Sequence, residues 1–162
     1  MRRTLITAIT LVSAAAMMSG AGLALASTSA SPSSTRHEKF RIIGTSETAK
    51  RQSVIATGSF QGGGSVALGK TIDKVALYKG SFEVTRHVTF RTPPAPPSGC
   101  IVRVTERGTY KLSHGAGRYA GIRGTGTFAS RITIVLARTG SSSCGATVAF
   151  QQITYESGTV NK

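Results

Sequence analysis

The sequence contains few of the residues from which catalytic and metal sites are usually built. It has three histidines, two cysteines, six acidic residues and one asparagine among 162 residues. No His-x-His or Cys-x-x-Cys pair occurs, so we expect no metal site, and we also predict no cofactor. A Ser-His-carboxylate triad is not predicted, because the histidines fall in an N-terminal leader (His37), on an outward strand position (His87) and in a loop (His114).

Amphipathic helices are also missing from the sequence pattern. No window keeps apolar residues at i, i+3, i+4 and i+7 over three turns, whereas from Phe40 onward short runs of Val, Ile, Thr, Phe and Tyr alternate with Gly, Pro and Ser. This pattern predicts an all-β chain of eight strands, arranged as a closed barrel or a sandwich. The predicted strands span residues 39–48, 53–61, 65–70, 74–79, 81–91, 100–113, 125–138 and 146–157.

A glycine-rich stretch, HGAGRYAGIRGTGTF at residues 114–128, lacks the features of a nucleotide-binding loop. Its first three glycines span one residue too many for G-x-G-x-x-G, a strand rather than a helix follows, and no P-loop Lys-Ser/Thr occurs. We predict that these glycines form a tight connection and a bulged strand entry. The alternative is a backbone anion site helped by Arg118 and Arg123, which we expect at the rim of a pocket.

The N-terminal segment predicts export. Arg2 and Arg3 precede a stretch of apolar or small residues that ends in Ala24-Leu25-Ala26, a typical signal-peptidase site. We therefore expect a signal peptide at residues 1–26, a disordered Ser/Thr-rich leader at 27–38 and a barrel domain at 39–162, in a protein secreted by the general route. The alternative is an uncleaved membrane anchor.

The charge is strongly positive. The formal net charge is +14, and removal of Arg2 and Arg3 with the signal peptide would leave 18 basic and six acidic residues. Such a surface favours anionic partners, among them wall polymers, lipid headgroups and nucleic acid, although a merely solvated basic surface has the same composition. We predict no sequence-specific nucleic-acid binding, because the known motifs are absent.

The alternation of apolar and polar residues along the strands predicts the register of two hairpins. If strands 81–91 and 100–113 pair with residue numbers summing to 192, their even-numbered apolar residues share one face, and Arg86 lies opposite Glu106 on it. Arg103, Arg107 and Lys111 then form an outward basic row. In the last hairpin a sum of 284 gives these pairs: Leu136 with Val148, Ile134 with Phe150, Ile132 with Gln152, and Phe128 with Glu156.

An up-and-down arrangement of the eight strands predicts a disulfide. Loops 92–99 and 139–145 lie at one end, so Cys100 and Cys144, which border them, can meet without threading the barrel. Exported proteins encounter an oxidising compartment, and this bridge would stabilise the fold by about 4 kcal/mol in the chain-entropy model. The alternative is two buried free thiols.

Residues 108–128, GTYKLSHGAGRYAGIRGTGTF, resemble the glycine-aromatic pattern of the allene oxide cyclase-like and dirigent-like β-barrels. The segments ATGSFQGGG (56–64) and GSFEVTRHVTF (80–90) are similar to that family's preceding hairpins, and the likeness covers about residues 53–157. The resemblance implies an eight-stranded antiparallel up-and-down β-barrel with an apolar interior, often trimeric in the plant members.

The resemblance does not extend to the family's activities. Plant cyclases are expected to use a pocket glutamate with asparagines that hold a water, but the one asparagine here is Asn161, in the tail. Dirigent proteins use pocket carboxylates that include aspartates, and Asp73, the one aspartate here, falls in a predicted turn. Fold alone does not define function.

We therefore predict a secreted barrel that binds a small apolar molecule without catalysis, with a homo-trimer as one assembly. One alternative is an isomerase, cyclase or dirigent-like activity on such a molecule, with Glu106 and Arg86 as the polar groups. Another is a cationic surface protein that binds anionic cell-wall polymers. The predicted pocket residues are Phe82, Val84, Val88, Phe90, Val102, Val104, Tyr110, Phe128 and Gln152.

Overall fold

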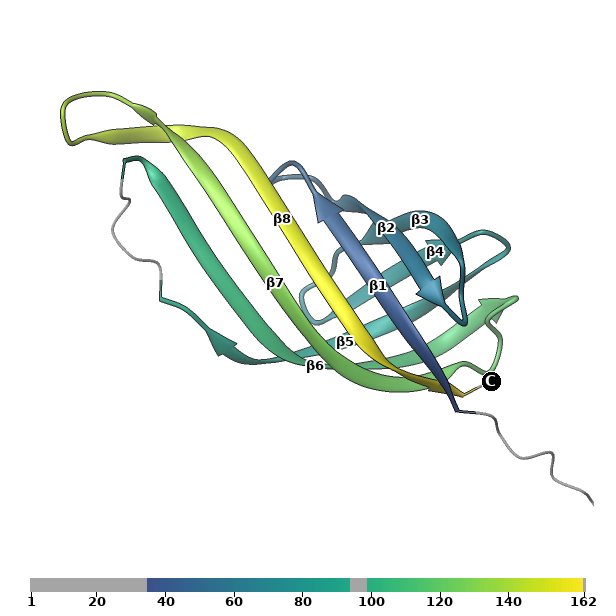
Figure 1. Cartoon of the computed structure of the whole chain (residues 1–162). Helices are drawn as coiled ribbons and strands as arrows, with labels where there is room; N and C mark the ends of the chain where they lie inside the picture. Colours follow the sequence, from purple (N-terminus) through teal and green to yellow (C-terminus); the bar gives the residue numbers. More distant parts are fainter. Residues whose placement is uncertain (1–34, 94–98, 162) are drawn as a thin grey trace, which may run out of the picture. The chain divides into compact units, whose positions relative to one another are not determined.

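Alternate residues are buried along the short strands, as expected for strands with one face turned to a core. The computed structural model describes residues 35–93 and 99–161, and each strand there pairs antiparallel with the next until β8 returns to β1 (Figure 1). The predicted closed, eight-stranded, up-and-down barrel is therefore confirmed. The strands are β1 (Arg36–Gly44), β2 (Arg51–Gly58), β3 (Gly62–Ala67), β4 (Ile72–Leu77), β5 (Gly80–Arg91), β6 (Ile101–Gly117), β7 (Arg123–Arg138) and β8 (Cys144–Asn161).

The first strand starts earlier than predicted. β1 begins at Arg36, so His37 and Glu38 belong to the barrel and not to a leader. The side chain of Glu38 is fully buried because it continues the inward-facing series of Phe40 and Ile42. The predicted signal peptide and the leader up to residue 34 lie outside the described residues. Within the part of the chain that the structure describes, no helix is long and apolar enough to cross a membrane.

One end of the interior, here called the aromatic end, is densely packed. The rings of Phe60 and Phe82 lie 6.1 Å apart, and Tyr119 meets them edge-on at 5.0 and 5.5 Å. Tyr119 and Ile122 come from the turn between β6 and β7 and are buried, so the glycine-rich stretch closes this end of the barrel. Gly117 and Gly121 take φ values of +62° and +79° there, which glycine adopts at little cost.

Two further glycines make room for a large side chain. A Cβ atom on Gly158 would lie 2.6 Å from the Tyr110 hydroxyl, and one on Gly126 would lie 2.7 Å from the Tyr110 ring. Gly126 pairs with both Tyr110 and Gly158 on adjacent strands. The ring of Tyr110 therefore lies flat across β7 and β8, inside the barrel.

The register of the last hairpin is confirmed over most of its length. Phe128 pairs with Glu156, Ile132 with Gln152 and Ile134 with Phe150. Leu136 pairs with Thr147 rather than with Val148, because the register shifts between Val135 and Leu136.

The predicted register of the other hairpin is wrong. Arg86 lies opposite Tyr110, and Glu106 lies opposite Arg91, so the pair sums are 196 and 197 instead of 192. A slip of four residues keeps the side chains up to Val88 on their predicted faces, so alternation alone does not exclude it. Irregularities occur between Ser81 and Glu83 and between Val88 and Phe90. The second one places Phe90 opposite Arg107 and Arg91 opposite Glu106, so these two residues of β5 leave their predicted faces.

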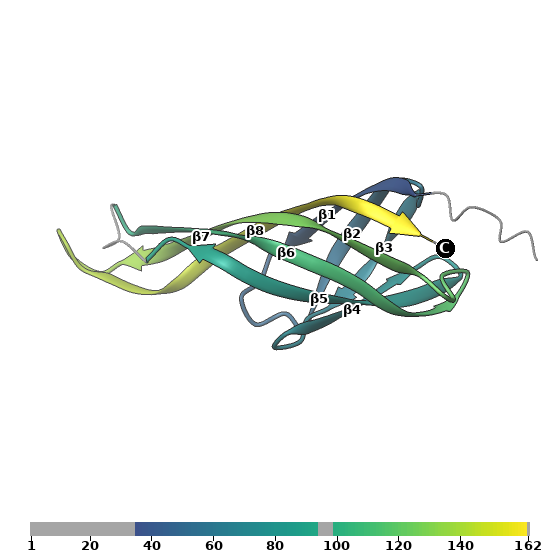
Figure 2. The same cartoon turned by 90° about the horizontal axis from the view of Figure 1, so that it is seen from below.

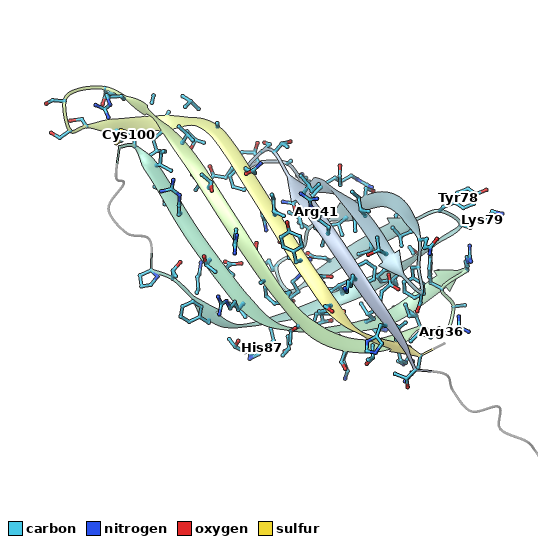
Figure 3. All side chains as sticks on the ribbon, in the orientation of Figure 1. Arg36, Arg41, Tyr78, Lys79, His87 and Cys100 are labelled. Atoms are coloured by element: carbon cyan, nitrogen blue, oxygen red, sulfur yellow. A yellow bond between two sulfur atoms is a disulfide. The ribbon has the colours of Figure 1, made fainter. Side chains whose placement is uncertain are left out.

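The long strands β5–β8 continue beyond the closed ring. β8 pairs with β1 only from Gln152 onward, whereas its pairing with β7 continues back to Cys144. Figures 1 and 2 show this extension running past the ends of β1–β4. The predicted disulfide between Cys100 and Cys144 is confirmed and ties β6 to the β7–β8 hairpin, with 5.5 Å between the Cα atoms. Cys100 is labelled at the start of β6 in Figure 3.

Candidate functional site

An arginine occupies the interior at the end opposite the aromatic cluster, here called the cavity end. Arg86 of β5 donates a hydrogen bond through Nη1 to Asp73 of β4. It donates a second one through Nε to Glu156 of β8, at 2.8 Å. Nη2 lies 2.7 Å from the same glutamate oxygen without hydrogen-bonding alignment. The guanidinium also lies over the Phe128 ring, 5.8 Å from its centroid. One cation therefore holds two carboxylates across the barrel.

This ion cluster is shielded from water. The side chains of Arg86, Asp73 and Glu156 are 17%, 7% and 1% exposed. Burial raises the pKa of Glu156, because the charged carboxylate loses its hydration. The Arg86 charge and hydrogen bond lower that pKa again, and nearby Asp73 raises it further. Glu156 Oε2 has no hydrogen-bond partner, which fits a carboxyl group that holds its proton more readily than usual.

Amide and hydroxyl groups extend the polar region along β7 and β8. Gln52 donates to Gln152 at 3.0 Å, and Gln152 donates to Ser130 at 3.3 Å and to Thr154 at 3.4 Å. Thr154 in turn donates to Ser130 at 2.9 Å. This network satisfies most of the buried polar atoms beside the ion cluster, although Gln52 Oε1 has no partner.

A cavity of about 190 Å³ opens beside these groups. Its polar wall includes Asp73, Arg86 and Glu106, and its apolar wall includes Val88 and Phe128. The remaining lining comes from the loop between β3 and β4 and from the amide and hydroxyl network, namely Leu68, Gly69, Lys70, Thr71, Ser130, Gln152 and Thr154. Pockets for drug-sized ligands measure about 300 to 1,000 Å³, so this cavity suits a smaller molecule.

Arg86 and Glu106 share this cavity but do not pair with each other, which corrects the predicted ion pair. Glu106 binds Arg91 instead, with 3.0 Å between Oε1 and Nε. The shifted β5–β6 register places Arg91 beside Glu106 and leaves Arg86 to the carboxylates of β4 and β8. Asp73 is correspondingly not in a turn, because it lies in β4 and is 5% exposed.

The predicted pocket residues fall into four groups. Val88, Phe128 and Gln152 line the cavity. Val102 and Val104 line a separate apolar depression on the extension, together with Ile134. Phe90 is 51% exposed. The other three belong to the packed core: Phe82, Val84 and Tyr110. The interior is thus mainly apolar at the aromatic end and polar at the cavity end.

Arg118 and Arg123 do not lie at the rim of this cavity. They flank the turn between β6 and β7, which closes the aromatic end. The cavity is lined instead by the loop after β3, which up-and-down order places at the opposite end. Both arginines are exposed.

A second buried carboxyl group lies at the aromatic end. Glu38 Oε2 accepts a hydrogen bond from the Phe60 backbone at 2.7 Å, and Oε1 has no partner. Burial raises the pKa of Glu38 to about 7, against the opposing effect of backbone hydrogen bonds. The pKa of Tyr110 is raised as well, first by burial and then by the charges of Glu156 and Glu38. The strict even-numbered series 38, 40, 42 was the sequence signal for Glu38.

No metal centre is formed by the described side chains. Within residues 35–93 and 99–161, no three His, Cys, Asp or Glu residues are grouped so that they could hold an ion. Asp73 and Glu156 lie together, but Arg86 occupies the space between them.

The fold and cavity define a class of protein: an antiparallel up-and-down β-barrel with one packed aromatic end and one polar, hollow end. In comparisons with known proteins, no family model, no curated protein and no solved structure matches the chain. The geometry of the cavity end is therefore the basis for assigning a function.

Proposed function

We propose that the barrel binds a small organic molecule in the cavity at its cavity end. The observation that carries this proposal is the ion cluster of Arg86, Asp73 and Glu156 beside an unfilled volume of about 190 Å³. Burying such charges costs free energy that apolar side chains would not require. A few polar groups set in an apolar wall are typical of ligand sites, where they orient the ligand.

The cavity favours a ligand with both an apolar body and a hydrogen-bonding group. Leu68, Val88 and Phe128 offer apolar contacts, whereas Arg86 and Gln152 offer polar ones. This differs from the purely apolar ligand expected from sequence. The resemblance of residues 108–128 to barrels that hold organic molecules in their interiors supports the same kind of ligand.

Binding without reaction fits the cavity better than catalysis. Each carboxylate on the wall is held by an arginine, Asp73 by Arg86 and Glu106 by Arg91. Glu156 has a raised pKa but lies behind Arg86, with 1% of its side chain exposed. A general base must reach the proton that it removes, and none of these groups is both free and accessible.

A blocked cavity tests the proposal. Val88→Trp places a large ring at the cavity lip, where the valine is 46% exposed and the fold can accept it. His87→Trp adds the same ring on the outer face and is the matched control. Saturation-transfer NMR with a library of small amphiphilic molecules should detect ligands of the natural protein and of His87→Trp, but not of Val88→Trp. Equal binding by Val88→Trp would contradict the site.

We also propose that the protein is exported. The Cys100–Cys144 disulfide supports this, since disulfides persist in oxidising compartments. Mass spectrometry of the protein recovered outside its host cells should find Ser27 as the N-terminus, and recovery with intact residues 1–26 in the membrane fraction would favour an anchor.

A further inference from the structure

The barrel separates its charges between inside and outside. Sixteen of the seventeen Lys and Arg residues that the structure describes are exposed, and the exception is Arg86. Of the six acidic residues in the chain, only Glu47 is exposed. Glu38, Asp73 and Glu156 are buried, and Glu83 and Glu106 are partly buried in pairs with His114 and Arg91. The outer surface is therefore much more cationic than the net charge indicates.

Two parallel rows of outward side chains cross β6, β7, β8 and β1. The first row is Arg107, Ala129, Tyr155 and Arg41, in the order of neighbouring strands. The second row is Thr109, Thr127, Ser157 and Lys39. Strands lie about 4.8 Å apart, so Arg107 and Arg41, the two cationic ends of the first row, are about 14 Å from each other. The second row has a cation, Lys39, at one end. Figure 3 labels Arg41 on β1.

A shallow groove runs between these cationic ends. Its volume is about 450 Å³, and the outward residues that line it include Thr89, Thr109, Thr127, Ser157 and Tyr155. Gly108, Ala129 and the inward-facing Phe128 and Glu156 complete its lining beside Arg107. Arg107 lies in the groove wall, and the Arg41 guanidinium lies 5.7 Å from the centroid of the Tyr155 ring. Tyr155 is 50% exposed. Small side chains at the centre keep the groove open.

We propose that this outer groove binds an anionic polysaccharide. Guanidinium groups at both edges match carboxylate or sulfate groups, which they bind through paired hydrogen bonds. The threonine and serine hydroxyls between them match the neutral hydroxyls of sugar rings, and Tyr155 offers an apolar face with a polar tip. The site lies on the outside of the sheet. Its lining shares Phe128 with the cavity proposed above, but the arginine, hydroxyl and tyrosine side chains that would bind the polymer do not line that cavity.

Other polyanions fit the groove less well. A lipid surface would require large apolar side chains among the cations, but Phe128 in the groove lining is buried, and Tyr155 is the large side chain that faces outward there. Single-stranded nucleic acid is held by several stacked aromatic side chains, and Tyr155 is the one aromatic ring on the outer face of this groove. Neither partner would use the row of hydroxyl groups.

The cationic edges are tested with polygalacturonate. Arg41→Gln/Arg107→Gln should weaken its binding about fivefold, since each exposed charge contributes about 0.2 to 1 kcal/mol. Arg51→Gln/Lys74→Gln removes as much charge from β2 and β4 and should change binding less than about twofold. Equal losses in the two variants would overturn a localised site. Biolayer interferometry at several salt concentrations measures both, with uncharged dextran as the negative control.

The hydroxyl floor distinguishes a glycan from other polyanions. Thr109→Val/Thr127→Val preserves shape and charge, so it should weaken polygalacturonate severalfold and leave an oligothymidylate of equal charge unaffected. The glycan assignment would be overturned if this variant lost affinity for oligothymidylate to the same extent. It would also be overturned if the natural protein bound oligothymidylate or phosphatidylglycerol vesicles as tightly as polygalacturonate. Unchanged melting temperatures verify that each variant is folded.

Discussion

At the aromatic end of the barrel, the interior is filled by the rings of Phe40, Phe60, Phe82 and Tyr119, whereas at the cavity end one arginine holds two carboxylates beside a cavity. The same eight strands build both ends, and the same alternation turns Phe40, Phe82 and Arg86 inward, whereas Phe60 and Tyr119 come from turns. Close-packed apolar side chains contribute to stability, but a buried ion cluster with unpaired atoms contributes little or opposes it. The comparison indicates that the aromatic end maintains the fold and the cavity end serves a ligand.

The largest expected effect is the difference in the free energy of unfolding between removing a packed ring and removing an exposed ring of β5. Phe82→Ala should lower the free energy of unfolding by about 4 kcal/mol, because Phe82 is fully buried and its loss leaves a cavity. Phe90→Ala should cost less than about 1 kcal/mol, since Phe90 is 51% exposed. Urea denaturation measures both, and a similar cost for the two variants would mean that the extension is as tightly packed as the aromatic end.

A smaller effect concerns the buried carboxyl group of Glu38 at the aromatic end. The pKa of Glu38 is raised from 4.5 to about 7, so the folded state binds more protons than the unfolded state between these pH values. The free energy of unfolding should therefore fall as the pH rises from about 4.5 to about 7, by about 3 kcal/mol. The raised pKa of Glu156 also makes the free energy of unfolding fall as the pH rises.

Glu38→Gln keeps an acceptor for the Phe60 backbone and removes the titration, so its stability should change less over this range. Glu47→Gln, at an exposed position, is the control and should retain the full slope. Denaturation of the three proteins at pH 4.5, 5.5, 6.5 and 7.5 measures the difference. A slope that Glu38→Gln leaves intact would show that Glu38 is not the group responsible.

The sequence predicted the fold because alternation and turn residues are local properties of each strand. The β7–β8 register was predictable as well, since a short connection between two long alternating strands restricts their pairing. The β5–β6 register was not, because a long loop permits slips by even numbers of residues that leave Arg86 and Glu106 on the same face.

The cavity end could be predicted only in part, for a similar reason. Alternation indicates that Arg86, Gln152 and Glu156 face inward, which the structure bears out. It does not indicate which groups meet across the barrel. Asp73 and Glu156 reach Arg86 from strands on both sides of it in the ring, and such contacts depend on the closed geometry of all eight strands.

The most direct test of the comparison is to replace the whole ion cluster with apolar side chains. Arg86→Met alone should lower the free energy of unfolding by about 3 to 5 kcal/mol, because it leaves two buried carboxylates unpaired. The triple variant Asp73→Leu/Arg86→Met/Glu156→Leu removes all three charges, so it should be as stable as the natural protein or more stable. It should nevertheless lose the small ligands detected by NMR. A triple variant that unfolds, or that still binds them, would contradict the assignment of the cavity end to function rather than stability.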